Sequence, residues 1–178
     1  EETILRVLSC AKTLCDELVV IDTGSTDKTV ELAKEAGAEV YFFDWIDDFA
    51  AARNFALEKC TNDWVIWLDA DDVIPAEHQV KLKNLKENIL NDETINILFL
   101  PYERDFAEDG SCTFSVIRER LFRKSANYHW VGVVHEVVPV DYSKSLTFND
   151  IKIQHKKPSH LWERQTDRNI RILEKAIQ

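Results

Sequence analysis

The chain has 178 residues and a formal net charge of −10, with 45% hydrophobic and 30% charged residues. This length and apolar content suffice for one α/β domain with a hydrophobic core. The acidic balance, without a basic stripe, excludes a general nucleic-acid groove. No apolar run approaches the roughly 20 residues that span a membrane, and no signal peptide is evident. The four cysteines form no C-x-x-C pair, which favours reduced thiols.

The first half of the chain alternates helical and extended patterns. Helical periodicity predicts helices over 2–14, 28–36, 49–60 and 75–90. Apolar runs predict strands over 18–21, 39–43, 64–68 and 95–100. Gly37 stands where a helix commonly ends. Strands separated by helices predict βαβ units and a mostly parallel sheet.

After Pro101 the pattern changes to shorter and less regular elements. The sequence Glu-Asp-Gly at 108–110 predicts a hairpin turn. Short strands are predicted over 114–117, 120–123, 131–140 and 146–154. A final amphipathic helix is predicted over 159–177, with apolar residues expected to pack it onto the domain: Leu161, Ile170, Leu173 and Ile177.

The stretch 64–72 joins the most apolar strand to a group of carboxylates. Its five large apolar residues predict a strand buried on both faces, as in the middle of a parallel sheet. Asp69, Asp71 and Asp72 follow at the carboxyl end, where open α/β sheets bind ligands. Hard oxygen ligands at Asp-x-Asp spacing suit Mg²⁺ or Mn²⁺. The alternative is a solvated acidic loop.

Two further residues belong near this sheet edge. Asp22 ends the strand 18–21, so we expect it at the same edge as Asp69. Arg53, on the helix 49–60, offers a planar fork of donors for a phosphate or a carbonyl. An ordinary surface arginine, or an ion pair with Asp47 or Asp48, are the alternatives for Arg53.

Four motifs together resemble those of family 2 glycosyltransferases. They are Val-Ile-Asp-Thr-Gly-Ser-Thr-Asp-Lys-Thr at 20–29, Ala-Arg-Asn at 52–54, Trp-Leu-Asp-Ala-Asp-Asp at 67–72 and Val-His-Glu at 134–136. More narrowly, the chain is similar to the bacterial branch related to lipopolysaccharide-core glucosyltransferases. The resemblance implies a GT-A fold: a Rossmann-like α/β fold with a mostly parallel sheet flanked by helices and a smaller mixed β region in the second half.

The resemblance also implies an activity. The family moves a sugar from a nucleotide-diphosphate donor, here expected to be a UDP-sugar, to an acceptor hydroxyl with inversion. The cofactor would be Mn²⁺ or Mg²⁺, and the acceptor a saccharide, a lipid-linked molecule or a protein. Residues 1–178 would form one domain: a nucleotide-sugar half over 1–101, an acceptor and catalytic half over 102–158, and a helix over 159–178. Cell-envelope biosynthesis in the cytoplasm, or at the inner face of the membrane, is the expected setting.

The donor-binding roles follow from the matching positions. The resemblance places Asp22 and Thr23 at the nucleoside base and Arg53 at the base or the phosphates. Asp69 would face the ribose or the metal, and Asp71 would bind the metal.

The remaining roles belong to the second half of the chain. An inverting transfer needs one base, and Glu136 is the candidate. His135 would contact the diphosphate or the metal, and His155 is a weaker candidate for the same task. Tyr128 and Trp130 would form a stacking wall for the acceptor sugar. A packing or hydrogen-bonding role is the alternative for each of these residues.

One departure and three rival functions accompany the resemblance. The family begins with a buried strand that runs into a Lys-Asn-Glu-Glu-like turn, and Glu1-Glu2 resembles the end of that turn, so we expect the strand itself to be missing. Asp69 also fits the Asp-x-Asp nucleophile of a HAD-like phosphatase. A sugar nucleotidyltransferase shares the α/β layout. A non-catalytic nucleotide-sugar binding module would keep Asp22 and Asp71 but could lose the base.

Overall fold

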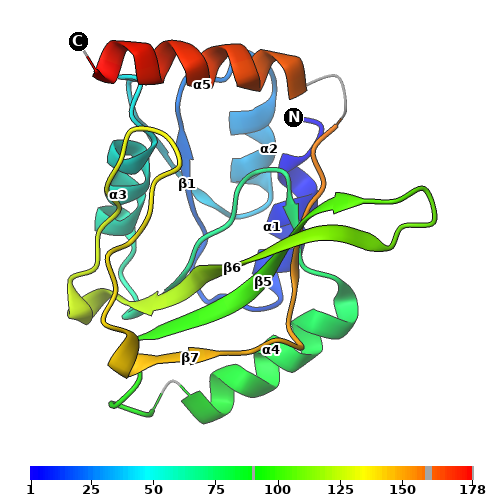
Figure 1. The fold of residues 1–178 in the computed structure, drawn as a ribbon, viewed down its shortest axis with the longest axis vertical. Helices are drawn as coiled ribbons and strands as arrows, with labels where there is room; N and C mark the ends of the chain where they lie inside the picture. The colour runs from blue at the N-terminus through cyan, green and yellow to red at the C-terminus, as the bar shows by residue number, and fades with distance from the viewer. Residues whose placement is uncertain (90, 159–161, 178) are drawn as a thin grey trace.

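The computed structural model describes residues 1–89, 91–158 and 162–177 (Figure 1). The helices are α1 (Ile4–Lys12), α2 (Thr29–Glu35), α3 (Phe49–Lys59), α4 (Ala76–Ile89) and α5 (Trp162–Ala176). The strands are β1 (Val19–Asp22), β2 (Glu39–Phe42), β3 (Trp64–Ile66), β4 (Asp72–Val73), β5 (Ile97–Phe106), β6 (Cys112–Arg123), β7 (Ser145–Thr147) and β8 (Ile153–His155). The alternation of strand and helix in the first half is therefore confirmed.

The strands form two sheets. Strands β1 and β2 pair in parallel, and the larger sheet has the order β3-β6-β5-β8-β4, with β7 also beside β5. Its neighbours pair both ways: β5 is antiparallel to β6 but parallel to β7 and β8. The predicted α/β class is confirmed, and the larger sheet is mixed rather than mostly parallel. Figure 1 shows β5 and β6 crossing the middle of the molecule, with α4 below them and α5 above.

Strand β3 does not occupy the predicted place in the middle of a parallel sheet. It lies at one end of the strand order, and among the described strands it pairs only with β6, in the antiparallel direction. Its residues are half-buried, and Val65 and Ile66 pack into different hydrophobic clusters. The apolar run correctly predicted that both faces of β3 pack against other residues. It could not report strand direction, because direction depends on distant partners.

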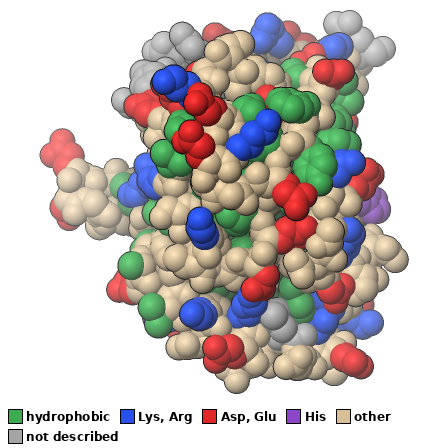
Figure 2. All heavy atoms as spheres, turned by 180° about the vertical axis from the view of Figure 1, so that it is seen from behind, with side chains coloured by type: hydrophobic (Ala, Val, Ile, Leu, Met, Phe, Trp, Pro, Cys, Tyr) green, Lys and Arg blue, Asp and Glu red, His purple; other side chains and the backbone are tan. Residues whose placement is uncertain are grey.

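Strands β5 and β6 form one long hairpin, and its second strand replaces two short strands predicted over 114–117 and 120–123. Strand β6 runs unbroken over the two stretches predicted separately. The hairpin turn at 108–110 is confirmed, with Gly110 at φ +83°. Figure 2 shows this hairpin projecting from the body with acidic side chains at its tip. The stretch predicted as a strand over 146–154 is divided between β7 and β8.

The segment 131–140 is not the predicted strand. The backbone adopts positive φ at Gly132 (+99°) and His135 (+57°), which reverses its direction. Only one bridge remains, between Val131 and Val137. An apolar run predicts extended structure, but two residues in the left-handed region convert it into a loop.

Helix α5 packs through a different residue from those predicted. Ile172 is 3% exposed, whereas Ile170 and Leu173 are 50% and 42% exposed, and Ile177 is 85% exposed. Their predicted packing role is therefore wrong, and the prediction for Leu161 lies outside the described residues. No helix in the described ranges combines the length and hydropathy needed to cross a membrane.

A buried ion pair joins the sheet to the acidic stretch that follows β3. Arg120 of β6 and Asp72 of β4 are both fully buried, and Arg120 Nη1 lies 3.0 Å from Asp72 Oδ2. The guanidinium is held between the rings of Trp67 and Tyr102, 3.8 and 3.9 Å from their centroids. Stacking and charge therefore fix one carboxylate in the core of the larger sheet.

We predict that Arg120→Met lowers the free energy of unfolding by about 3–5 kcal/mol, because it leaves the Asp72 carboxylate buried without its cation. Urea unfolding of parent and variant measures the difference. Arg171→Met, at an exposed position of α5, is the control and should stay within about 0.5 kcal/mol of the parent. A loss below about 1 kcal/mol for Arg120→Met would contradict the prediction.

Candidate active site

A cleft of about 500 Å³ opens between β1, α3, β3 and α5. Apolar residues of α1 and β1 line one part of it. The other part is polar and aromatic, with Thr23, Arg53, Asp69 and Arg168 beside Trp45, Phe49, Trp67 and Trp130. The cleft therefore combines apolar walls with a few charged groups, which is typical of small-molecule sites.

Asp22 shapes the loop at the end of β1. Its carboxylate accepts hydrogen bonds from the backbone N–H of Gly24 and of Ser25, each at 3.1 Å to Oδ2. Gly24 has φ +109°, a conformation that favours glycine. Thr23 follows, is exposed, and lines the cleft. The structure thus places Thr23 on the cleft wall and Asp22 directly behind it, and their nucleoside role stays a prediction.

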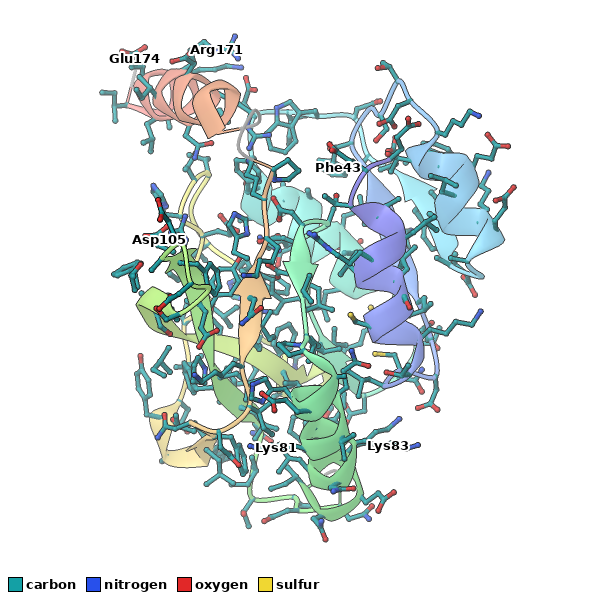
Figure 3. All side chains as sticks on the ribbon, turned by 90° about the vertical axis from the view of Figure 1, so that its right-hand side faces the viewer. Phe43, Lys81, Lys83, Asp105, Arg171 and Glu174 are labelled. Carbon is teal, nitrogen blue, oxygen red and sulfur yellow. The ribbon has the colours of Figure 1, made fainter. Side chains whose placement is uncertain are left out.

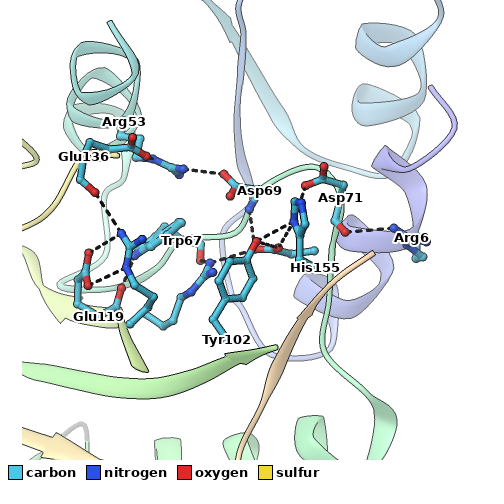
Figure 4. Close-up of polar contacts among 12 residues, drawn as sticks. Arg6, Arg53, Trp67, Asp69, Asp71, Tyr102, Glu119, Glu136 and His155 are labelled. Carbon is cyan, nitrogen blue, oxygen red and sulfur yellow. Dashed lines mark hydrogen bonds and ion pairs between the residues drawn. The ribbon is translucent and has the colours of Figure 1, made fainter. Parts of the chain in front are cut away.

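Arg53 links two carboxylates across the site (Figure 4). Its Nη2 lies 2.7 Å from Asp69 Oδ1, and its Nε lies 2.6 Å from Glu136 Oε1. The guanidinium also lies 4.2 Å from the centroid of the Trp67 ring. The expected alternatives for Arg53 are therefore wrong: Asp48 instead caps α3 and Asp47 pairs with Lys175.

These contacts change the pKa values of the partners. Burial raises the pKa of Asp69, but Arg53 and Arg120 outweigh burial, so the pKa lies below its ordinary value. Burial lowers the pKa of Arg53, and Asp69 with Glu136 more than reverses this. Asp69 and Arg53 therefore stay charged at neutral pH and hold each other in place.

Asp72 is the centre of a second network. Its Oδ1 accepts a hydrogen bond from the Tyr102 hydroxyl at 2.7 Å, and its Oδ2 accepts from Arg120 and from the Asp69 N–H. The Tyr102 hydroxyl also lies 2.8 Å from His155 Nδ1. Asp72 therefore positions both the acidic loop and the imidazole.

Asp71, Asp72 and His155 form a cluster that could hold a metal ion, with one ligand atom from each lying within 4.8 Å of the others. Burial raises the pKa of Asp71, and Asp69 and Asp72 add to the rise while His155 opposes it. The negative charge here is thus incompletely compensated, which a divalent cation would correct. Carboxylate and imidazole donors fit Mn²⁺. In the described part of the chain, neither Asp69 nor His135 belongs to this cluster.

The remaining predicted residues fall into three environments. His135 is exposed on the loop where φ is positive. Glu136 is 8% exposed and held by Arg53. Trp130 is 3% exposed and contacts Trp67 and Phe122 edge-on, although it lines the cleft. Tyr128 packs against Phe122 in the same hydrophobic cluster. Packing thus accounts for both aromatic residues, and their acceptor role stays a prediction.

Sequence reasoning missed the residues that orient the acidic loop. Tyr102 and Arg120, which contact Asp72, carried no motif, and neither did Arg168, which lines the cleft. One signal was available, the alternating charges Arg118-Glu119-Arg120 within β6. A charged residue in a strand of a packed sheet indicates a buried charge that needs a partner. Such a signal names no partner by itself.

A mixed α/β sheet with carboxylates directly after a strand is the arrangement expected of the GT-A fold. The chain belongs to glycosyl transferase family 2: residues 1–110 match the sequence model of that family. The rival phosphatase and nucleotidyltransferase classes are therefore not supported.

Three similar proteins illustrate the extent of the match. A TPR repeat-containing protein of Synechococcus elongatus is 36% identical over 137 residues, which are 77% of this chain and 32% of that protein. The SPbeta prophage-derived glycosyltransferase SunS of Bacillus subtilis is 30% identical over 183 residues, covering 98% of this chain and 42% of SunS. A crystal structure of a mycobacterial protein has a TM-score of 0.65 at 19% identity, covering 97% of this chain and 69% of that one. The chain thus spans less than half the length of both relatives.

We predict a measurable energetic coupling between Arg53 and Glu136. In a double-mutant cycle of Arg53→Gln and Glu136→Gln, the coupling should be roughly 0.5–3 kcal/mol, because the two groups are close and shielded from water. Urea unfolding of the four proteins gives the coupling. The same cycle with Arg53→Gln and Asp105→Asn, an exposed carboxylate on the projecting hairpin, should give no coupling. Additive effects for Arg53 and Glu136 would contradict the ion pair.

Proposed function

We propose that this chain is the donor-binding and catalytic part of a metal-dependent, inverting glycosyltransferase that uses a UDP-sugar. The observation that carries the proposal is the cluster of Asp71, Asp72 and His155, joined by the acidic loop to the Arg53 cleft. Membership of family 2 and the name of the relative SunS support sugar transfer.

The donor would lie along the carboxyl ends of β1 and β3. Thr23, on the cleft wall, is proposed to contact the nucleoside together with Asp22. Hydrogen bonds from its own loop hold the Asp22 carboxylate in place. Asp71 and His155 would hold Mn²⁺ or Mg²⁺, with Asp72 orienting both. When bound, the cation would offset the negative charge of the diphosphate as it leaves.

The transfer itself needs one proton acceptor. The acceptor hydroxyl oxygen would form a bond to the anomeric carbon while the bond to the diphosphate oxygen breaks, and the electron pair leaves with the diphosphate. We propose that Glu136 takes the hydroxyl proton. Its Oε1 is held by Arg53, and in the described part of the chain its Oε2 has no hydrogen-bond partner. Arg53 would thus hold the carboxylate while one oxygen receives the proton.

The acceptor class is also a proposal: a saccharide, a lipid-linked molecule or a protein. A non-catalytic binding module would bind donor through the same groups without transferring sugar. A turnover assay with a panel of UDP-sugars, in which the release of UDP is measured, distinguishes the transferase from the binding module. The binding module would release no UDP.

We predict that UDP raises the melting temperature of the chain more in Mn²⁺ than in EDTA, because a ligand that binds the folded state stabilises it. Asp71→Asn should remove that difference, since it deletes one charged oxygen ligand. Differential scanning fluorimetry measures both effects. Asp105→Asn, which changes the same charge away from the cluster, should behave like the parent. A full metal-dependent shift in Asp71→Asn would exclude Asp71 from the site.

We further predict that Glu136→Gln lowers the rate of sugar transfer by roughly 100-fold or more while UDP affinity stays near the parental value. Glutamine keeps the shape of the side chain but cannot accept the proton. Single-turnover kinetics and calorimetry give the two quantities. Transfer at the parental rate would show that another residue is the base, and Asp105 or Asp109 would be tested next.

A further inference from the structure

Helix α5 is fastened to the loop that begins α3. Lys175 Nζ lies 2.8 Å from Asp47 Oδ2, and the Arg168 guanidinium lies 4.8 Å from the centroid of the Phe49 ring. Positions 168 and 175 are seven residues apart, close to two helical turns, so they share one face. Ile172, between them, is buried. This face of α5 is therefore held over the N-terminus of α3.

Arg168 reaches the cleft from this helix. It lines the same cavity as Thr23, Arg53 and Asp69, which lie in the first half of the chain. Among residues 167–176 of α5, whose side chains the structure describes, Arg168 is the one on the cavity wall. The C-terminal helix thus contributes one cationic side chain to the proposed donor site.

The charge of Arg168 differs from that of Arg53 in one respect. Arg53 is compensated by two carboxylates. Arg168 has no ion pair with any carboxylate in the described part of the chain, and its buried Nε has no hydrogen-bond partner there. Burial lowers the pKa of Arg168 below its ordinary value. A partly buried guanidinium without a counter-charge is costly, and an anionic ligand would remove that cost.

The ligand that fits is an anion whose oxygens belong to a planar carboxylate or a tetrahedral phosphate. A guanidinium binds phosphate oxygens through parallel N–H donors. Asp69 lies on the same cavity wall, so a diphosphate there would gain from an uncompensated protein cation in addition to the proposed metal ion. From this geometry we propose that Arg168 binds the diphosphate of the nucleotide donor, an inference that rests on the proposed function.

The test compares ligands that differ only in their phosphates. Calorimetry in Mn²⁺ with UDP and with uridine is carried out on the parent chain, Arg168→Gln and Arg168→Lys. Arg168→Gln should weaken UDP binding about 10-fold or more and leave uridine binding unchanged. Arg168→Lys should recover part of the UDP affinity, because it keeps the charge but loses the fork of donors.

Arg171→Gln is the matched control, since it removes the same charge from the same helix. Arg171 is exposed, and Figure 3 shows it on the outer side of α5. Its UDP affinity should equal that of the parent. Unchanged UDP affinity in Arg168→Gln would overturn the inference, as would an equal loss for UDP and uridine, which would indicate that Arg168 only supports α5. A parent chain that binds no UDP at all would overturn the proposed function and the inference with it.

Discussion

The acidic stretch after β3 depends on the buried ion pair between Asp72 and Arg120. A carboxylate in the core is tolerated only with a counter-charge and satisfied hydrogen bonds. Arg120 supplies the charge, while Tyr102 and the Asp69 N–H complete the hydrogen bonds. One side chain is thereby immobilised in the sheet, and the neighbouring Asp69 and Asp71 are delivered to the site on a fixed backbone.

Two consequences follow from this anchor. Asp69 points to Arg53, so the first half of the chain becomes connected to Glu136 in the second half. Asp71 lies beside His155, whose imidazole is oriented by the same Tyr102 hydroxyl that binds Asp72. The proposed donor contacts, metal ligands and base are therefore coupled through charged hydrogen bonds rather than held independently.

The two arginines of the cleft differ in how their charge is balanced. Arg53 is neutralised within the protein and acts as a structural link between Asp69 and Glu136. Arg168 is brought by α5 and lacks a carboxylate partner among the described residues. In the proposed function the cleft binds an anion beside a cluster of carboxylates, and the uncompensated charge of Arg168 would attract it.

The sequence by itself determined the local structure and the family. Helices α1 to α4 and strands β1 and β2 were predicted within a few residues, because helical periodicity, Gly37 and apolar runs act over neighbouring positions. The motifs around Asp22, Arg53 and Asp69 carried the family resemblance for the same reason. Prediction was wrong for the loop 131–140, where two positive φ angles override an apolar run.

Tertiary structure alone decided which charges meet. Arg53 and Glu136 are 83 residues apart in the chain. Arg120 is 48 residues from Asp72, and Tyr102 is 30 residues from it. No pattern of neighbouring residues encodes such pairs, because each depends on strand direction and register in the assembled sheet. The sequence placed the carboxylates at a strand end, and the fold determined which of them is buried, which is paired and which remains available to a ligand.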